Sequence, residues 1–153
     1  MTLAGLQEAM CKALRESAYL RAHAIPVVAE DEGNVAAEWD ARFARTHLAV
    51  TVGAASFAPT SRDSRVITGM ARLAVTVWEQ PSRNRVGQNR LGPNAAEVAE
   101  ALACEMHLAP FGGGVLVFTG VGGVERADEK TITRTVGFET LATLTGEEQN
   151  GNH

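Results

Sequence analysis

The stretch of residues 65–106 constrains the fold most, because it predicts a long strand, a basic loop and a capped helix in succession. Over residues 66–80, apolar side chains alternate with others, as in a strand with one face on a core. Pro81 has no backbone N–H to donate and therefore ends the strand. Because a strand of this length exceeds the usual size, we expect it to overhang its sheet, with a β-bulge at Gly69.

The helix after the basic loop has a recognisable start. Asn94 follows Pro93 and precedes Glu97 by three residues, the spacing of a capping box. Apolar residues then recur at helical spacing and predict one buried face: Ala95, Val98, Ala99, Leu102 and Met106. The sequence therefore predicts a capped helix that begins after Asn94 and packs one face on the core.

The other segments complete the prediction of the fold class. Predicted helices span residues 3–19 and 35–45, and further predicted strands span residues 24–29, 48–52, 115–118 and 131–144. The strand over 115–118 is expected to be buried on both faces. The order α-β-α-β-β-α-β-β predicts an α/β (α+β) fold, a single mixed, mostly antiparallel sheet with helices packed on it.

The domain organisation follows from length and local composition. A chain of 153 residues is most simply one domain, which we place at residues 1–146, with a polar C-terminal tail at 147–153. Residues 53–64 are mostly small and polar, and predict a long connection or an extended arm.

Composition limits the functional class. The net charge of −4 argues against a dedicated nucleic-acid-binding protein, which usually has a basic excess. No apolar run approaches the ~20 residues of a membrane helix, and the charged N-terminal segment does not have the pattern of a signal peptide. Cys11 and Cys104 fall in predicted helices, so we expect two reduced, buried thiols in a soluble protein made in the cytoplasm.

The glycines and histidines do not form a recognisable cofactor or metal motif. Neither the 112–114 nor the 120–123 glycine cluster precedes a helix at the spacing of a phosphate cradle. The best metal-ligand pair is Cys104 with His107, and two ligands without a third do not make a zinc site. We therefore expect no cofactor and no bound metal.

No catalytic motif stands out either. The sequence lacks Gly-x-Ser-x-Gly, and Ser56 and Ser64 have no histidine nearby. Glu97, Glu100 and Glu105 line the outward side of the predicted helix, where a solvated face is the simpler interpretation. The expectation is a protein that is not an enzyme.

The basic loop is the most suggestive feature. Residues 82–92 contain Arg83, Arg85 and Arg90 and no acidic residue. One interpretation is ionic docking on an acidic neighbour or on DNA phosphates, and the other is a solvated loop. An acidic counterpart in an adjacent copy is the segment with Asp128 and Glu129.

The order of elements is similar to that of the tail terminator (tail completion) proteins of long-tailed phages and prophages. Three stretches carry the likeness: the strand end and loop at residues 79–85, the helix from Ala95 to Leu102 that continues to His107, and the closing strand at 134–139. The resemblance covers most of the chain as a pattern of elements, without a diagnostic signature.

The resemblance implies a virion protein that forms a homohexameric ring at the neck, caps the last ring of tail tube protein and joins the tail to the head–tail connector protein. The implied working surfaces are loops and sheet edges, which here are the sites of Arg62, Arg65, Arg83, Arg85 and Arg90. A ring needs heterologous contacts, and a basic loop against Glu125, Asp128 and Glu129 of the next copy would be one. Arginines that face the lumen would contact DNA weakly.

Other functions stay open at this point. Another neck, head–tail connector or minor tail protein would have a similar size and composition. A small enzyme would use Glu97, Glu100, Glu105 and His107, and would need a pocket with a perturbed carboxylate. A nucleic-acid-binding module would use the arginine loop and bind less tightly as salt increases.

Overall fold

The computed structural model describes residues 1–30, 46–60 and 65–145. These residues form an α+β fold with one open main sheet, as the sequence predicts. The elements are α1 (Leu3–Arg15), α2 (Ala18–Ala22), β1 (Val27–Ala29), β2 (Leu48–Val52), β3 (Ser56–Pro59), β4 (Ile67–Glu79), the 3₁₀ helix η1 (Pro81–Asn84), β5 (Arg85–Val86), β6 (Asn89–Arg90), α4 (Ala95–Met106), β7 (Pro110–Phe111), β8 (Gly114–Val115), β9 (Val117–Val121), β10 (Glu125–Arg126) and β11 (Ile132–Leu144).

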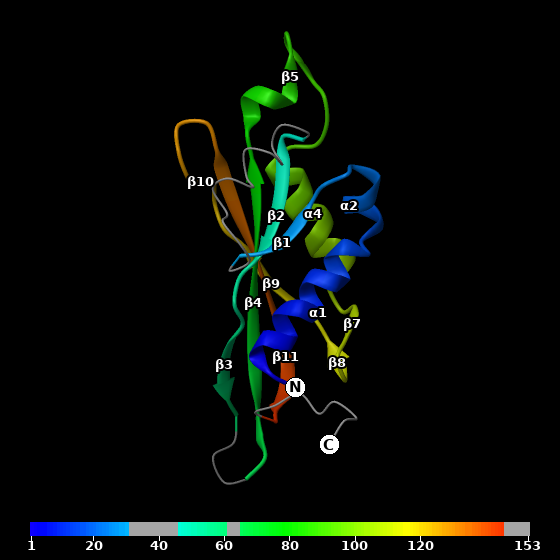
Figure 1. Cartoon of the computed structure of the whole chain (residues 1–153), viewed down its shortest axis with the longest axis vertical. Helices are drawn as coiled ribbons and strands as arrows, with labels where there is room; N and C mark the ends of the chain where they lie inside the picture. Colours follow the sequence, from blue (N-terminus) through cyan, green and yellow to red (C-terminus); the bar gives the residue numbers. More distant parts are fainter. Residues whose placement is uncertain (31–45, 61–64, 146–153) are drawn as a thin grey trace.

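The sheet is built on one long antiparallel pair, β4 with β11, which runs along the long axis of the molecule (Figure 1). The two strands are in register over 13 residues each, from the pair Glu79 and Ile132 to the pair Ile67 and Leu144. Because β11 pairs with β4 along its whole length, the expected overhang of the long strand is wrong. Apolar alternation in both strands explains the pairing, since it presents one continuous apolar face.

Shorter strands flank this pair on both sides. β2 and β3 follow one another along the outer edge of β4, and β10 and β9 do the same along β11. β1 pairs in parallel with β2, while the other described pairs are antiparallel, so the predicted mixed, mostly antiparallel sheet is confirmed. Residues 53–64, predicted as a long connection or an extended arm, contain strand β3, which pairs with β4.

Gly69 lies in regular register opposite both Ala142 and Pro59, so the predicted bulge at Gly69 is wrong. A Cβ atom at this position would lie 2.2 Å from the carbonyl oxygen of Ala58, which explains why glycine is required where β3 passes. The irregularity of the sheet is instead between Gly137 and Phe138 of β11, where the pairing with β9 shifts.

The described helices lie on the same side of the sheet (Figure 1). α1 contacts β1, β2 and β4, while α4 contacts β4, β9 and β11. The core between helices and sheet stabilises the fold by removing apolar surface from water. Its fully buried large side chains include Leu6, Met10, Leu14, Leu73, Val75, Leu102 and Phe138.

Three further expectations change in detail. The predicted first helix is two helices, because Ser17 interrupts it and its hydroxyl accepts a hydrogen bond from the Leu20 N–H, which starts α2. The strand predicted over 115–118 is divided in the structure: Val115 ends β8, Leu116 lies between the strands and is buried, and β9 begins at Val117. Since Val115 is exposed and the β9 side chains are half-buried or exposed, a strand buried on both faces is wrong. Cys11 is buried as expected, but Cys104 is exposed.

The predicted helix over 35–45 lies outside the described residues.

Candidate assembly surface

The basic loop forms a projection beyond the end of β4, which we call the tip and define as residues 81–91. It consists of η1 followed by the small hairpin β5–β6, and it stands at one end of the molecule (Figure 1). Gly87 has φ +62°, the left-handed conformation that glycine adopts without cost, and lies between the two strands. The sequence identified this segment as basic and as a loop, but did not identify the hairpin.

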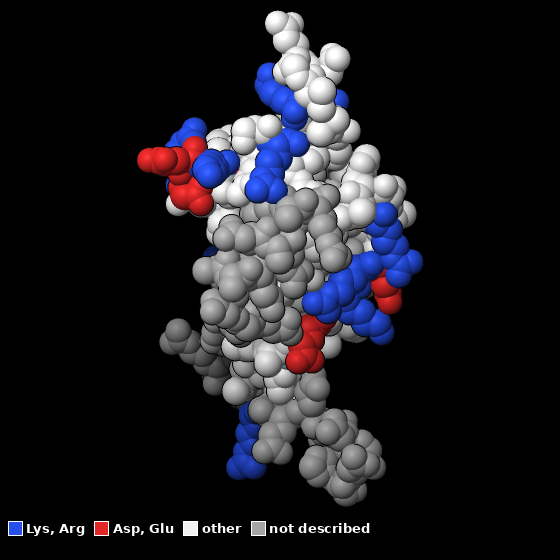
Figure 2. Space-filling view, turned by 45° about the horizontal axis from the view of Figure 1, so that its top comes forward, with Lys and Arg blue, Asp and Glu red and all other residues white. Residues whose placement is uncertain are grey.

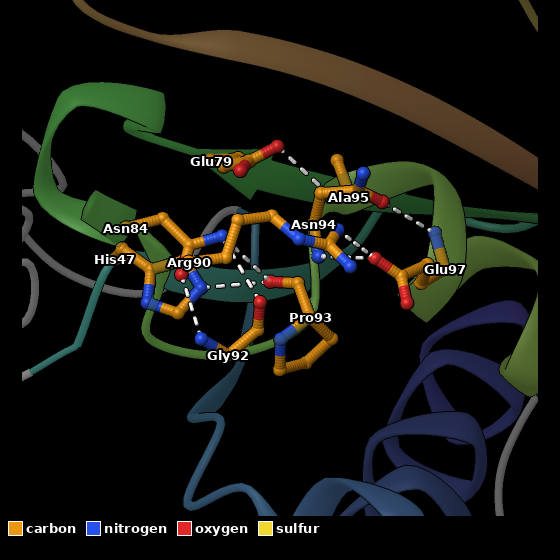
Figure 3. Close-up of polar contacts among 9 residues, drawn as sticks. All are labelled: His47, Glu79, Asn84, Arg90, Gly92, Pro93, Asn94, Ala95 and Glu97. Atoms are coloured by element: carbon orange, nitrogen blue, oxygen red, sulfur yellow. Dashed lines mark hydrogen bonds and ion pairs between the residues drawn. The ribbon is translucent and has the colours of Figure 1, made fainter. Parts of the chain in front are cut away.

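A buried asparagine joins the two ends of the tip (Figure 3). Asn84 is only 2% exposed, and its Nδ2 donates to the carbonyl oxygens of Gly92, at 3.1 Å, and Pro93, at 3.3 Å. Its Oδ1 accepts from the Gly92 N–H at 2.9 Å. Because one side chain satisfies three backbone groups, the hairpin has a fixed base.

Two side chains from other elements extend this base. His47, which precedes β2, lies 2.8 Å from the Pro93 carbonyl oxygen through Nε2, so Nε2 carries the proton in this contact. Glu79 is 4% exposed, and its carboxylate accepts from the Ala95 N–H at 2.9 Å, at the start of α4. A negative group is favourable at a helix N-terminus, so Glu79 fixes α4 to the end of the sheet.

The predicted capping box is confirmed. The Asn94 side chain accepts from the Glu97 N–H at 2.9 Å, and the Asn94 N–H donates to Glu97 Oε1 at 3.4 Å. Arg90 of the tip also donates to Glu97 Oε1 (Figure 3). The hydrogen bond from Arg90, followed by that from Asn94, lowers the pKa of Glu97 from its ordinary value. The tip is thus connected to the first turn of α4 within one chain.

The exposed surface of the tip combines positive charge with apolar side chains. Arg85 and Arg90 are directly opposite one another in the β5–β6 pair, an arrangement in which like charges are destabilising. Glu97 compensates Arg90, whereas Arg85 has no acidic partner among the described residues. Val86 and Leu91 are 64% and 63% exposed. Figure 2 shows basic side chains at the top of the molecule with no acidic ones among them.

The turn between β10 and β11 carries mixed charge instead (Figure 2). The Asp128 carboxylate accepts from the backbone N–H groups of Lys130, at 2.7 Å, and Thr131, at 2.8 Å. The first of these bonds is the main cause that lowers the pKa of Asp128. Arg126 donates to the carbonyl oxygen of Glu129 at 3.1 Å. The turn therefore uses much of its own hydrogen-bonding capacity.

The structure brings together part of the predicted interface. Arg83, Arg85 and Arg90 lie on the tip, and the turn with its residues Glu125, Asp128 and Glu129 lies at the same end of the molecule (Figure 1). Arg65 precedes β4 at the opposite end, about 40 Å away at the rise of 13 strand residues. Arg62 lies outside the described residues.

Sequence reasoning did not identify the side chains that fix the tip. Asn84 and His47 belong to no pattern, because their partners are set by the fold. Glu79 could have been identified from the alternation in β4. It occupies an inward position, and the preceding inward residues Leu73, Val75 and Val77 are apolar. A carboxylate at such a position must have a partner.

The residues of the enzyme alternative do not converge. Glu97 is bonded to Arg90, and His107 is ten residues further along α4, about 15 Å at helical rise. His107 Nδ1 accepts from the Phe118 N–H at 3.1 Å, while Glu100 and Glu105 are exposed. Within the described ranges, no group of three or more His, Cys, Asp or Glu residues could hold a metal ion, and no helix could cross a membrane.

Comparisons with known proteins do not add a relative: no family model and no curated protein matches this chain. The function is therefore inferred from the residues and geometry described above.

Proposed function

We propose that this protein is a structural virion protein at the tail-to-head junction of a long-tailed phage or prophage, a tail terminator that acts by assembly and not by catalysis. Its ring caps the tail tube and joins it to the head–tail connector. The observation that carries the proposal is the tip, in which a buried base presents Arg85 and two exposed apolar side chains, Val86 and Leu91. A protrusion that is ordered before binding loses little conformational entropy on docking.

The two ends of the molecule support this role because their surfaces differ. The tip end adds three arginines, Arg83, Arg85 and Arg90, to its exposed apolar side chains. The opposite end exposes apolar side chains at the start of β4 and near the end of β11, with Arg65, among the described residues, alone beside the start of β4. Val66, Ile67 and Leu141 are 56%, 47% and 63% exposed. Isolated exposed apolar residues are common, but several at one end of a small protein favour a binding surface. A ring between two different partners, a tube and a connector, needs two different ends.

The first experiment measures the mass of the purified protein across a concentration series, by light scattering and native mass spectrometry. We expect a closed ring, a hexamer, whose contacts are heterologous. The second adds the protein to tails that lack a terminator and measures, by electron microscopy, whether tube length becomes uniform and whether heads attach. A protein that stays monomeric at every concentration and leaves such tails unchanged would contradict the proposal.

The tip also permits a second function, because arginine binds phosphate oxygens as well as carboxylates. In a ring, this chemistry would give weak contacts with DNA in the lumen. If binding DNA were the main function, affinity for a DNA duplex would be high at low salt and would fall steeply as salt increases. Another neck or minor tail protein would also join virions, and its position along labelled tails would distinguish it from a terminator.

A further inference from the structure

We infer that the tip of one copy docks on the outward face of α4 in a second copy, with Arg85 against Glu100 and Glu105. This inference rests on the ring of the proposed function and specifies which surfaces of neighbouring copies meet. Three properties of the structure lead to it: the opposed arginines of the tip, the uniform charge of α4, and the edge strands β1, β3 and β9 of the sheet.

One arginine of the tip, Arg85, has no carboxylate partner among the described residues. Arg85 and Arg90 face each other across the β5–β6 pair, and of these two only Arg90 meets a carboxylate among the described residues, that of Glu97. The described residues give the Arg85 guanidinium no hydrogen bond or ion pair. A carboxylate from another molecule would reduce the repulsion between the two arginines. The Arg85 guanidinium is therefore a favourable binding group for an anion.

The outward face of α4 supplies such carboxylates. The helix contains three glutamates and no lysine or arginine. Glu97 is bound by the tip of its own chain. Glu100 and Glu105 are exposed, and their carboxylates have no hydrogen bond or ion pair to another described residue. Between them lie Ala101 and Cys104, small side chains that leave room for Val86 and Leu91. The contact of Arg90 with Glu97 already shows a tip arginine on this helix.

The β10–β11 turn is a poorer acceptor than α4. Residues 125–130 contain three acidic and two basic side chains, so their charges nearly cancel. Asp128 is engaged by two backbone N–H groups of the turn itself. An arginine approaching the turn would also meet Arg126 and Lys130, which repel it.

Continuation of the sheet from one copy to the next is also disfavoured at three of its edge strands, β1, β3 and β9. At the β1 edge, the Val27 carbonyl oxygen accepts from Arg15 Nε and Nη2, at 3.3 and 3.2 Å. On β9, the Phe118 N–H donates to His107, and β3 contains Pro59, which has no N–H. Such features oppose edge-to-edge pairing at these three strands. Contacts between copies then depend on side chains, and the tip offers the charge that complements α4.

A charge-reversal cycle tests the contact. Four proteins are compared by light scattering and native mass spectrometry: wild type, Arg85→Glu, the pair Glu100→Arg with Glu105→Arg, and all three changes together. Arg85→Glu and the α4 double variant should each raise the concentration at the midpoint of assembly about tenfold or more. The combined variant should return this concentration to within about threefold of wild type. Lys12→Glu, an exposed reversal on α1, is the matched control and should leave the midpoint unchanged.

The outcomes separate this inference from the proposed function. Circular dichroism verifies that each variant is folded. Loss of assembly in Arg85→Glu without loss in the α4 variant, or no recovery in the combined variant, would overturn the contact. Loss of DNA binding in Arg85→Glu with assembly unchanged would do the same and would assign the tip to phosphates. If the assembly midpoints change as expected but the protein does not cap tails, the terminator role alone is overturned. If the protein caps tails but the combined variant does not regain assembly, the contact alone is overturned.

Discussion

The tip and the β10–β11 turn are two charged projections at the same end of the molecule, and they differ in how their charges are used. In the tip, positive residues face each other and Arg85 has no described acidic partner. In the turn, both signs are present, and the Asp128 carboxylate closes the turn by accepting from two of its backbone N–H groups. Exposure and charge are common to both, so neither property identifies a binding surface. Hydrogen-bonding capacity that the chain itself does not satisfy is the better indicator.

The two projections are also held by different means. The base of the tip is a buried side-chain network that joins segments distant in sequence, including His47 and Pro93. The turn is held by local hydrogen bonds over two and three residues. A change at the base of the tip should therefore affect the stability of the whole protein, whereas a change in the turn should stay local.

The largest expected effect is that of Asn84→Ala. The change leaves the Gly92 N–H and the Gly92 and Pro93 carbonyl groups without this partner in a buried place, so the free energy of unfolding should fall by about 2–3 kcal/mol. Denaturant titration measures the loss. Asn89→Ala, at an exposed position of the same hairpin, is the control and should change stability by less than about 0.5 kcal/mol. Equal effects of the two changes would show that the base does not hold the tip.

Gly87→Ala should have a smaller effect that is confined to the backbone. Gly87 has φ +62° and no atom within 4 Å of an added Cβ, so the expected loss of about 1 kcal/mol comes from the left-handed conformation alone. Gly113→Ala is the matched control, because that position is equally open and lacks the positive φ. Thermal unfolding of both variants measures the difference, and no difference between them would exclude the described turn.

A change in the turn should be smaller still and local. Asp128→Ala removes the acceptor for the Lys130 and Thr131 N–H groups, so hydrogen exchange at these two amides should accelerate while the amides of the tip keep their rates. Glu129→Ala should leave exchange unchanged, since Glu129 contributes its backbone carbonyl to the turn. A global loss of protection in Asp128→Ala would contradict the division between a local turn and a buried base.

The smallest expected effect is that of Glu97→Gln on the melting temperature, and it should depend on pH. The pKa of Glu97 is lowered in the folded protein, so its contribution to stability is present above the ordinary glutamate pKa and is lost as pH falls through the folded pKa. Glu97→Gln should therefore lower the melting temperature at about pH 7 and have less effect at about pH 3. Glu100→Gln, on the same exposed helix face, is the control and should show no such trend. A gap between wild type and Glu97→Gln that does not narrow in acid would contradict the role of the Arg90 contact.

Local patterns in the sequence determined much of this protein. Alternation predicted β4 and β11, and helical spacing with a capping box predicted α4 from Asn94, because periodicity and caps depend on residues a few positions apart. The fold class followed from these elements. The sequence also placed positive charge on the loop that became the tip, since composition alone carries that information.

The tertiary structure decided what local patterns do not contain. It folded the basic loop into a hairpin on a base made by Asn84 and His47, paired β3 with β4, and separated Arg65 from the tip by the length of a strand. It also decided which charges meet, Arg90 with Glu97 and Asp128 with its own turn. Each of these depends on the close approach of groups that the chain brings together only when it packs, so the surface left available for a partner is a property of the folded molecule.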